Sequence, residues 1–112
     1  MKALISASNI CGKVAVPSSK SYTLRGLACA ALAPGRSVLF NPLDADDTVV
    51  ARNVLREIGV GIEQKNGSWI VDGGRFREPA TDLYCGESAG TLRFLTAICS
   101  LVPGTCRLTA AP

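Results

Sequence analysis

The stretch Thr-Leu-Arg-Gly-Leu at residues 23–27 indicates an internal repeat, because a similar stretch, Thr-Leu-Arg-Phe-Leu, occurs at residues 91–95. Each copy leads into a Pro-Gly pair, at residues 34–35 and 103–104, and then into a strand-like stretch. Similarity at a fixed spacing is typical of one supersecondary unit that is used again. The sequence therefore predicts one complete unit and the start of a second. The alternative is chance, since two buried helices can share leucines and Pro-Gly stops.

The composition is that of a compact domain. The chain has 112 residues, of which 47% are apolar and 19% charged, and this excludes disorder. A net charge of +3, scattered along the chain, predicts no nucleic-acid partner. Because the chain has no His, a His-based triad is excluded and acid–base chemistry would fall to Lys, Asp or Glu. We expect no membrane span, no targeting peptide and a cytoplasmic location.

Apolar periodicity predicts an α/β or α+β fold. We expect helices at residues 19–33, 48–58 and 92–102, and strands at residues 2–6, 13–16, 36–40, 61–64, 68–72, 81–85 and 105–109. Asn66-Gly67 between two alternating runs predicts a hairpin, in which Trp69 is a packing residue. The third helix is apolar on nearly every side, so we expect it to be mostly buried.

The cysteines and the acidic run at residues 44–47 are expected to serve the fold. Five cysteines are an odd number and none lies in a C-x-x-C spacing, which predicts reduced, buried thiols. Asp44, Asp46 and Asp47 could ligate a metal ion, but capping of the next helix explains them with fewer assumptions. We therefore expect no metal.

Two strand-to-helix turns carry small or hydroxyl residues followed by an arginine. The first is Ser-Ser-Lys-Ser at residues 18–21 with Arg25, and the second is Gly-Glu-Ser-Ala-Gly-Thr at residues 86–91 with Arg93. A helix N-terminus offers free N–H groups and a positive dipole end, so each turn predicts a site for phosphate or carboxylate. Neither turn is a P-loop and no G-x-G-x-x-G occurs, which disfavours nucleotide binding.

The first turn has an ordinary interpretation as well. Ser18 or Ser19 could be a plain N-cap, Lys20 a solvated charge and Arg25 the partner of a nearby carboxylate. Arg25 favours an anion, because it is the only charge in the otherwise largely apolar helical stretch from Tyr22 to Ala33. Ser21 and Arg25 share a helix face, whereas Lys20 would reach an anion over the end of the helix.

Three segments resemble those of the 5-enolpyruvylshikimate-3-phosphate synthase (3-phosphoshikimate 1-carboxyvinyltransferase) family. Residues 16–25, Val-Pro-Ser-Ser-Lys-Ser-Tyr-Thr-Leu-Arg, resemble its P-G-S-K-S-x-x-x-R signature. Residues 43–47 and 86–93 resemble its L-x-S-D-D and G-N-A-G-T-x-x-R segments, in the same order. The likeness runs from about Asn9 to Pro112, and Lys20-Ser21 separates the chain from the related UDP-N-acetylglucosamine enolpyruvyl transferases, which carry Lys-Asn.

The resemblance implies a fragment of an inside-out α/β barrel built from βαβαββ units. Residues 1–112 would be the incomplete amino-terminal part of the enzyme, inactive without the remainder of the same chain. The implied reaction moves the enolpyruvyl group of phosphoenolpyruvate to the 5-hydroxyl of shikimate 3-phosphate, without metal or other cofactor. The alternative is a non-catalytic anion-binding or interaction module of the same fold.

The resemblance also implies residue roles. Lys20 would be catalytic and contact both substrates. The other implied positions are Ser21 and Arg25 for shikimate 3-phosphate, Ala89 and Gly90 for phosphoenolpyruvate, and Asp47, Glu87 and Arg93 as supporting residues.

Four positions depart from the family pattern. Ser18 and Ala89 replace glycines, Ala45 replaces a serine, and Glu87 replaces an asparagine. We expect the Ala89 methyl to crowd the phosphoenolpyruvate pocket and to weaken glyphosate, the family's inhibitor, more than the substrate. A carboxylate at Glu87 is unfavourable beside an anion unless a cation such as Arg93 offsets it.

Overall fold

The structure is a computed structural model that describes residues 1–111, and it has the mixed helix and strand content that the sequence predicts. Its elements in chain order are α1 (Lys20–Leu32), β1 (Gly35–Phe40), α2 (Asp46–Glu57), β2 (Gly61–Lys65), β3 (Ser68–Gly73), β4 (Leu83–Tyr84), α3 (Ala89–Cys99) and β5 (Leu108–Thr109).

The strands form two separate sheets. In the larger sheet the order is β1-β3-β2, and β3 runs antiparallel to both neighbours. β4 and β5 form a short parallel pair. The predicted hairpin is confirmed: Asn66 and Gly67 have φ values of 50° and 70°, the left-handed conformations that a two-residue turn of this kind requires.

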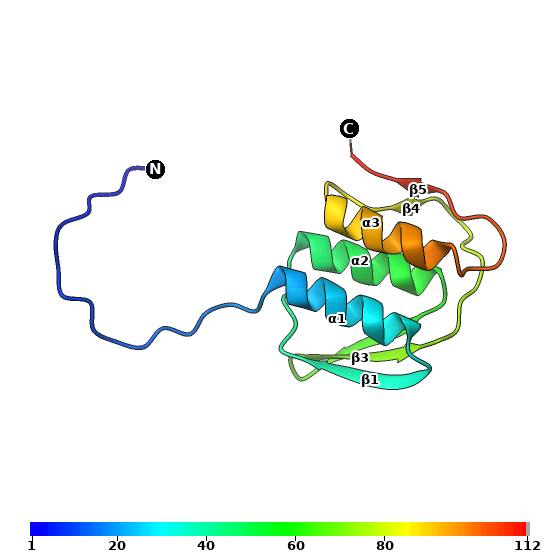
Figure 1. Cartoon of the computed structure of the whole chain (residues 1–112), viewed down its shortest axis with the longest axis horizontal. Helices are drawn as coiled ribbons and strands as arrows, with labels where there is room; N and C mark the ends of the chain where they lie inside the picture. The colour runs from blue at the N-terminus through cyan, green and yellow to red at the C-terminus, as the bar shows by residue number, and fades with distance from the viewer. Residues whose placement is uncertain (112) are drawn as a thin grey trace.

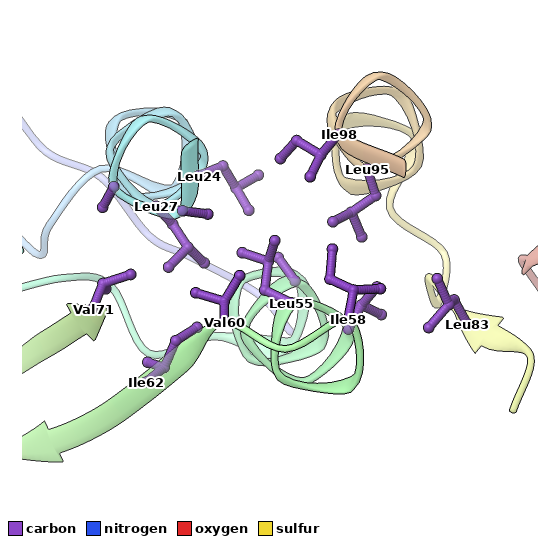
Figure 2. Close-up of a cluster of buried hydrophobic side chains, with 14 of the residues drawn as sticks. Leu24, Leu27, Leu55, Ile58, Val60, Ile62, Val71, Leu83, Leu95 and Ile98 are labelled. Carbon is purple, nitrogen blue, oxygen red and sulfur yellow. The ribbon is translucent and has the colours of Figure 1, made fainter. Parts of the chain in front are cut away.

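The helices form a layer between the two sheets (Figure 1). They enclose one continuous apolar core, to which α1 contributes Leu27, α2 contributes Leu55 and α3 contributes Leu95 (Figure 2). The β2–β3 hairpin completes the core with Trp69, which is 1% exposed, and its prediction as a packing residue is confirmed. Burial of this apolar surface is the main contribution to the stability of the fold.

The two strands predicted at residues 2–6 and 13–16 are wrong. No helix or strand precedes Lys20, and residues 1–17 are all exposed, including apolar Ile5 and Val14. The segment extends away from the folded body (Figure 1). A strand needs a hydrogen-bonded neighbour, and residues 1–17 have none in the part of the chain that the structure describes.

The predicted burial of the third helix is also wrong. α3 begins three residues earlier than expected and buries only Thr91, Leu95 and Ile98, whereas Arg93 and Thr96 are exposed. Its contacts with other helices are to α1 and α2, which cover only one of its faces. No helix in the described chain is long and apolar enough to cross a membrane.

The cysteines are free, as expected, but not uniformly buried. Cys85 is buried, Cys99 and Cys106 are partly buried, and Cys11 and Cys29 are exposed. Cys29 lies on the side of α1 that faces solvent.

Candidate functional site

The amino termini of α1 and α3 are built alike. Ser19 is the N-cap of α1, and its hydroxyl accepts a hydrogen bond from the Tyr22 amide at 3.3 Å. Ser88 caps α3 in the same way and accepts from the Thr91 amide at 3.2 Å. Each cap satisfies one free amide and leaves others at the helix end unpaired. The capping interpretation of Ser19 is therefore confirmed, and the second turn repeats it.

Asp47, in the first turn of α2, connects these two helix ends. Its carboxylate oxygen Oδ2 lies 2.8 Å from Lys20 Nζ. Its backbone carbonyl accepts a hydrogen bond from the Thr91 hydroxyl at 3.2 Å. The hydrogen bond from Lys20 lowers the pKa of Asp47 most, and the Ser88 hydroxyl lowers it further, while partial burial opposes both. Asp47 is thus ionised at neutral pH and holds the Lys20 ammonium beside the second turn.

An open cavity of about 330 Å³ lies between the two helix ends. Its lining includes most of the residues that the sequence singled out. They are Lys20, Ser21 and Arg25 from α1, Asp47 from α2, and Glu87, Ala89 and Gly90 from the second turn, joined by Leu24, Ser88 and Phe94. Segments far apart in the chain therefore converge on one surface that carries two cations and two helix N-termini.

Arg25 lies on the exposed side of α1. Its guanidinium donates a hydrogen bond to the Ser21 carbonyl at 3.0 Å and lies 6.0 Å from the centroid of the Phe94 ring. Within residues 1–111 no carboxylate forms an ion pair with it. The Arg25 charge is therefore free to meet a ligand.

Arg93 and Glu87 behave differently from the other candidates. Arg93 is exposed on α3 and does not line the cavity, whereas Glu87 does. No ion pair in the described part of the chain joins Glu87 to Arg93. The offset of the Glu87 charge by Arg93, which the sequence suggested, is therefore absent from residues 1–111.

The acidic run begins α2, with one difference from the prediction. Asp46 and Asp47 occupy the first turn as expected, but the N-cap is Ala45, which has no side chain to accept a hydrogen bond. The Thr48 hydroxyl accepts from the Ala45 amide at 3.0 Å instead. Asp44 lies outside the helix, 3.6 Å from Arg52. The structure holds no group of three His, Cys, Asp or Glu side chains among its described residues that could ligate a metal ion.

Sequence reasoning gave no site role to three residues of the cavity, Leu24, Ser88 and Phe94. Ser88 could have been assigned as a cap, because a serine just before an apolar helical run is a typical N-cap, although the offset between Thr23 and Thr91 aligns it with Lys20 rather than with Ser19. Phe94 had no such signal, because an aromatic residue in an apolar helix is usually a core residue. Only the packing of α1 against α3 places its ring beside Arg25.

Two cations at paired helix ends are typical of a protein that binds small anionic ligands on an α/β framework. A family model described as EPSP synthase (3-phosphoshikimate 1-carboxyvinyltransferase) matches residues 5–112. The chain therefore belongs to the EPSP synthase family.

Individual relatives support the same family assignment. A 3-phosphoshikimate 1-carboxyvinyltransferase from Dehalococcoides mccartyi is 50% identical over 101 residues, which are 88% of this chain and 24% of the relative. The protein of that name from Halobacterium salinarum is 36% identical over 111 residues, 97% of this chain and 26% of the relative. EPSP synthase from Acinetobacter baumannii has a similar structure, with a TM-score of 0.79 and 30% identity over 88% of this chain and 23% of that one. The chain thus spans about a quarter of the length of these relatives.

Proposed function

We propose that this chain forms the amino-terminal part of a cytoplasmic 3-phosphoshikimate 1-carboxyvinyltransferase, whose remainder completes the active site. The observation that carries the proposal is the cavity at which Lys20, Ser21 and Arg25 meet the turn at residues 86–90. On this proposal residues 1–112 hold one βαβαββ unit and the start of a second. The matched caps of α1 and α3 support that division.

Shikimate 3-phosphate would bind at the α1 side of the cavity. Ser21 and Arg25 would hydrogen-bond an anionic group of this ligand, since Arg25 has a planar set of donors and no competing carboxylate in the described chain. Lys20 is 55% exposed at its side chain, so its ammonium can turn toward a ligand while Asp47 remains close. The bound anion would then compete with Asp47 for the Lys20 charge.

Phosphoenolpyruvate would bind at the α3 side, against Ala89 and Gly90. The N-terminus of α3 supplies free amides and the positive end of a helix dipole, and both favour an anion. Asp47 and Glu87 would act as supporting residues rather than as direct anion ligands. Arg93 would support the site only through parts of the enzyme beyond this cavity, because it does not line it.

The reaction needs two anionic substrates close together. The oxygen of the 5-hydroxyl would form a bond to C2 of phosphoenolpyruvate while C3 takes up a proton and the hydroxyl loses one, which gives a tetrahedral intermediate. C3 would then lose a proton, its electron pair would re-form the C2–C3 double bond, and the bond from C2 to the phosphate oxygen would break as phosphate leaves with that electron pair. Lys20 and Arg25 would offset the repulsion between the substrates, and Lys20, which contacts both, would stabilise the charge that develops on the leaving phosphate. The proposed reaction uses no metal or other cofactor.

A chimera tests the proposal directly. Residues 5–112 would replace the matching segment of the Dehalococcoides mccartyi relative, and phosphate release from the two substrates would be measured. We expect an active chimera, and we expect Lys20→Met to lower kcat/KM by at least about 100-fold. Lys65→Met is the matched control, because Lys65 ends β2 outside the cavity and its loss should leave the rate unchanged. A folded chimera in which both variants keep full activity would contradict the proposal.

The alternative module makes a different prediction for the 112-residue chain alone. On the proposed function the chain has no turnover by itself but still binds shikimate 3-phosphate weakly. Titration followed by amide NMR shifts should move residues 18–25 in the wild type and lose those shifts in Arg25→Ala. Absence of shifts in the wild type would favour the non-catalytic module.

A further inference from the structure

Arg25 and Phe94 form a contact that no expected role explains. Arg25 lies on α1 and Phe94 on α3, 69 residues apart, yet the guanidinium carbon is 6.0 Å from the ring centroid. Both side chains line the same cavity as Lys20. Phe94 is partly buried and packs against the core, whereas the Arg25 side chain is exposed.

Arg25 differs from the three arginines that form ion pairs within residues 1–111. Arg36 and Arg107 pair with carboxylates, and so does Arg52, which also lies over Trp69. Arg25 contacts an aromatic face and a backbone carbonyl, and it forms no ion pair within residues 1–111. A carboxylate would neutralise the guanidinium and compete with a bound anion. An aromatic face attracts the cation and leaves most of its N–H donors available.

We propose that Phe94 is a positioning residue for Arg25, and that its ring holds the guanidinium toward the cavity where shikimate 3-phosphate binds. This inference rests on the proposed function for the identity of the ligand. The positioning contact itself exists in the ligand-free chain. Phe94 thus prepares Arg25 for binding and lowers the conformational entropy that the side chain loses when the ligand arrives.

Simple packing is the competing explanation, because Phe94 also lies near Leu24 and Leu27 in the apolar contact between α1 and α3. Phe94→Leu keeps apolar volume but removes the aromatic face, whereas Phe94→Tyr keeps the face. A purely packing role predicts that Leu is tolerated at least as well as Tyr. A positioning role predicts that Tyr restores binding and that Leu does not.

The test uses the 112-residue chain and two measurements. The first is the NMR resonance of the Arg25 side-chain Nε–H group without ligand, which a nearby ring shifts upfield. We expect the shift in the wild type and in Phe94→Tyr, and its loss in Phe94→Leu. The matched control is Tyr22→Leu, which removes an exposed aromatic ring of α1 outside this cavity and should leave the Arg25 resonance in place.

The second measurement is the affinity for shikimate 3-phosphate by NMR titration. Phe94→Leu should weaken binding by about two- to fivefold, the range expected for a cation–π contact at an exposed site. Phe94→Tyr should bind as tightly as the wild type. Equal binding by the wild type and Phe94→Leu, or an equal loss of binding in Phe94→Tyr and Phe94→Leu, would overturn the inference and leave the proposed function intact.

A wild-type chain that binds no shikimate 3-phosphate would overturn the ligand assignment and the proposed function together. The Arg25 resonance then decides the positioning contact on its own: a shift that survives in Phe94→Leu refutes it, and a shift lost there supports it.

Discussion

Lys20 Nζ lies 2.8 Å from Asp47 Oδ2, so the cation that begins α1 is held by the acid that begins α2. The Thr91 hydroxyl binds the backbone carbonyl of the same aspartate. One residue therefore relates the ends of all three helices. The proposed catalytic lysine has a defined place even without a ligand, because a carboxylate keeps its ammonium near the second turn.

This pair predicts a pH-dependent contribution to stability. Lys20 lowers the pKa of Asp47 below its ordinary value of 3.8, so the contribution is present above that value and is lost as pH falls through the folded-state pKa. Asp47→Asn should lower the free energy of unfolding at neutral pH by no more than about 1 kcal/mol, because the pair is partly exposed. Urea unfolding followed by circular dichroism from about pH 6 to pH 2 measures the difference between the two proteins.

The difference should shrink toward zero at the acid end. Asp72, whose pKa is also lowered, by Arg36, titrates in both proteins and cancels from the comparison. A difference that stays constant across the whole pH range would show that the ion pair is not its cause.

Ala45 predicts a stabilising substitution. It is the N-cap of α2 and has no side-chain oxygen, although its extended backbone is that of an ordinary cap. Ala45→Ser should raise the free energy of unfolding by about 1 kcal/mol, because the hydroxyl can accept from an amide of the first turn. The matched control is Ala80→Ser, in an exposed loop, which should change little. An equal effect of both serines in urea unfolding would argue against capping.

Gly73 and Gly67 predict two unequal costs. A Cβ on Gly73 would lie within 2.7 Å of the carbonyl oxygens of Ala31 and Ala33, so Gly73→Ala should cost at least about 3 kcal/mol or prevent folding. A Cβ on Gly67 would meet no atom within 4 Å, and its φ of 70° leaves only conformational strain of about 1 kcal/mol. Urea midpoints of the two variants measure both costs. Equal midpoints would contradict the close approach at Gly73.

Ala89 predicts altered inhibition in the chimera. Its side chain lies at the start of α3 on the wall of the cavity. If the methyl crowds the proposed phosphoenolpyruvate pocket, Ala89→Gly should strengthen inhibition by glyphosate about tenfold, the effect of one methyl group in a fitted pocket. The KM for phosphoenolpyruvate should change less. Equal inhibition constants for the two enzymes would exclude this role of the methyl group.

The thiols predict an order of chemical reactivity. Burial, and then the neighbouring thiol of Cys106, raises the pKa of Cys99 to about 12, and burial also raises the pKa of Cys85. Because the thiolate is the reactive form, iodoacetamide at about pH 8 should modify the exposed Cys11 and Cys29 first. Cys85 and Cys99 should react last. Peptide mass spectrometry over time measures the order. Fast labelling of Cys99 in the folded chain would contradict its burial.

Local signals predicted much of this fold. Asn66-Gly67 identified the hairpin because those two residues favour the conformation that the turn requires, and the Pro-Gly pair at residues 34–35 marked the end of α1. The second pair did not mark the end of α3, which lies at Cys99 rather than at the predicted residue 102. The strand predictions at residues 2–6 and 13–16 were wrong, because a strand also depends on a neighbouring strand, which no local pattern reveals. The prediction that α3 is mostly buried was wrong for the same reason. The apolar pattern indicates which side chains a helix can bury, but it does not indicate which elements cover them.

The candidate site was likewise predicted in part, by local signals, and its long-range contacts were not predicted. The repeat and the helix-end chemistry predicted that Lys20, Ser21 and Arg25 would share a site with the second turn, and the cavity places them together. The contact of Arg25 with Phe94 and the link from Asp47 to Thr91 join residues 69 and 44 positions apart. These contacts depend on how the three helices pack, which residue identity alone does not determine.

The buried indole of Trp69 has a practical consequence. It is the only tryptophan of the chain, it is 1% exposed, and the Arg52 guanidinium lies 4.9 Å from its ring. Its emission therefore reports a single place, the inner face of the hairpin against α2, and should shift to longer wavelength when water reaches it. The protein carries its own fluorescent label for hairpin docking, and this label does not line the cavity beside Lys20.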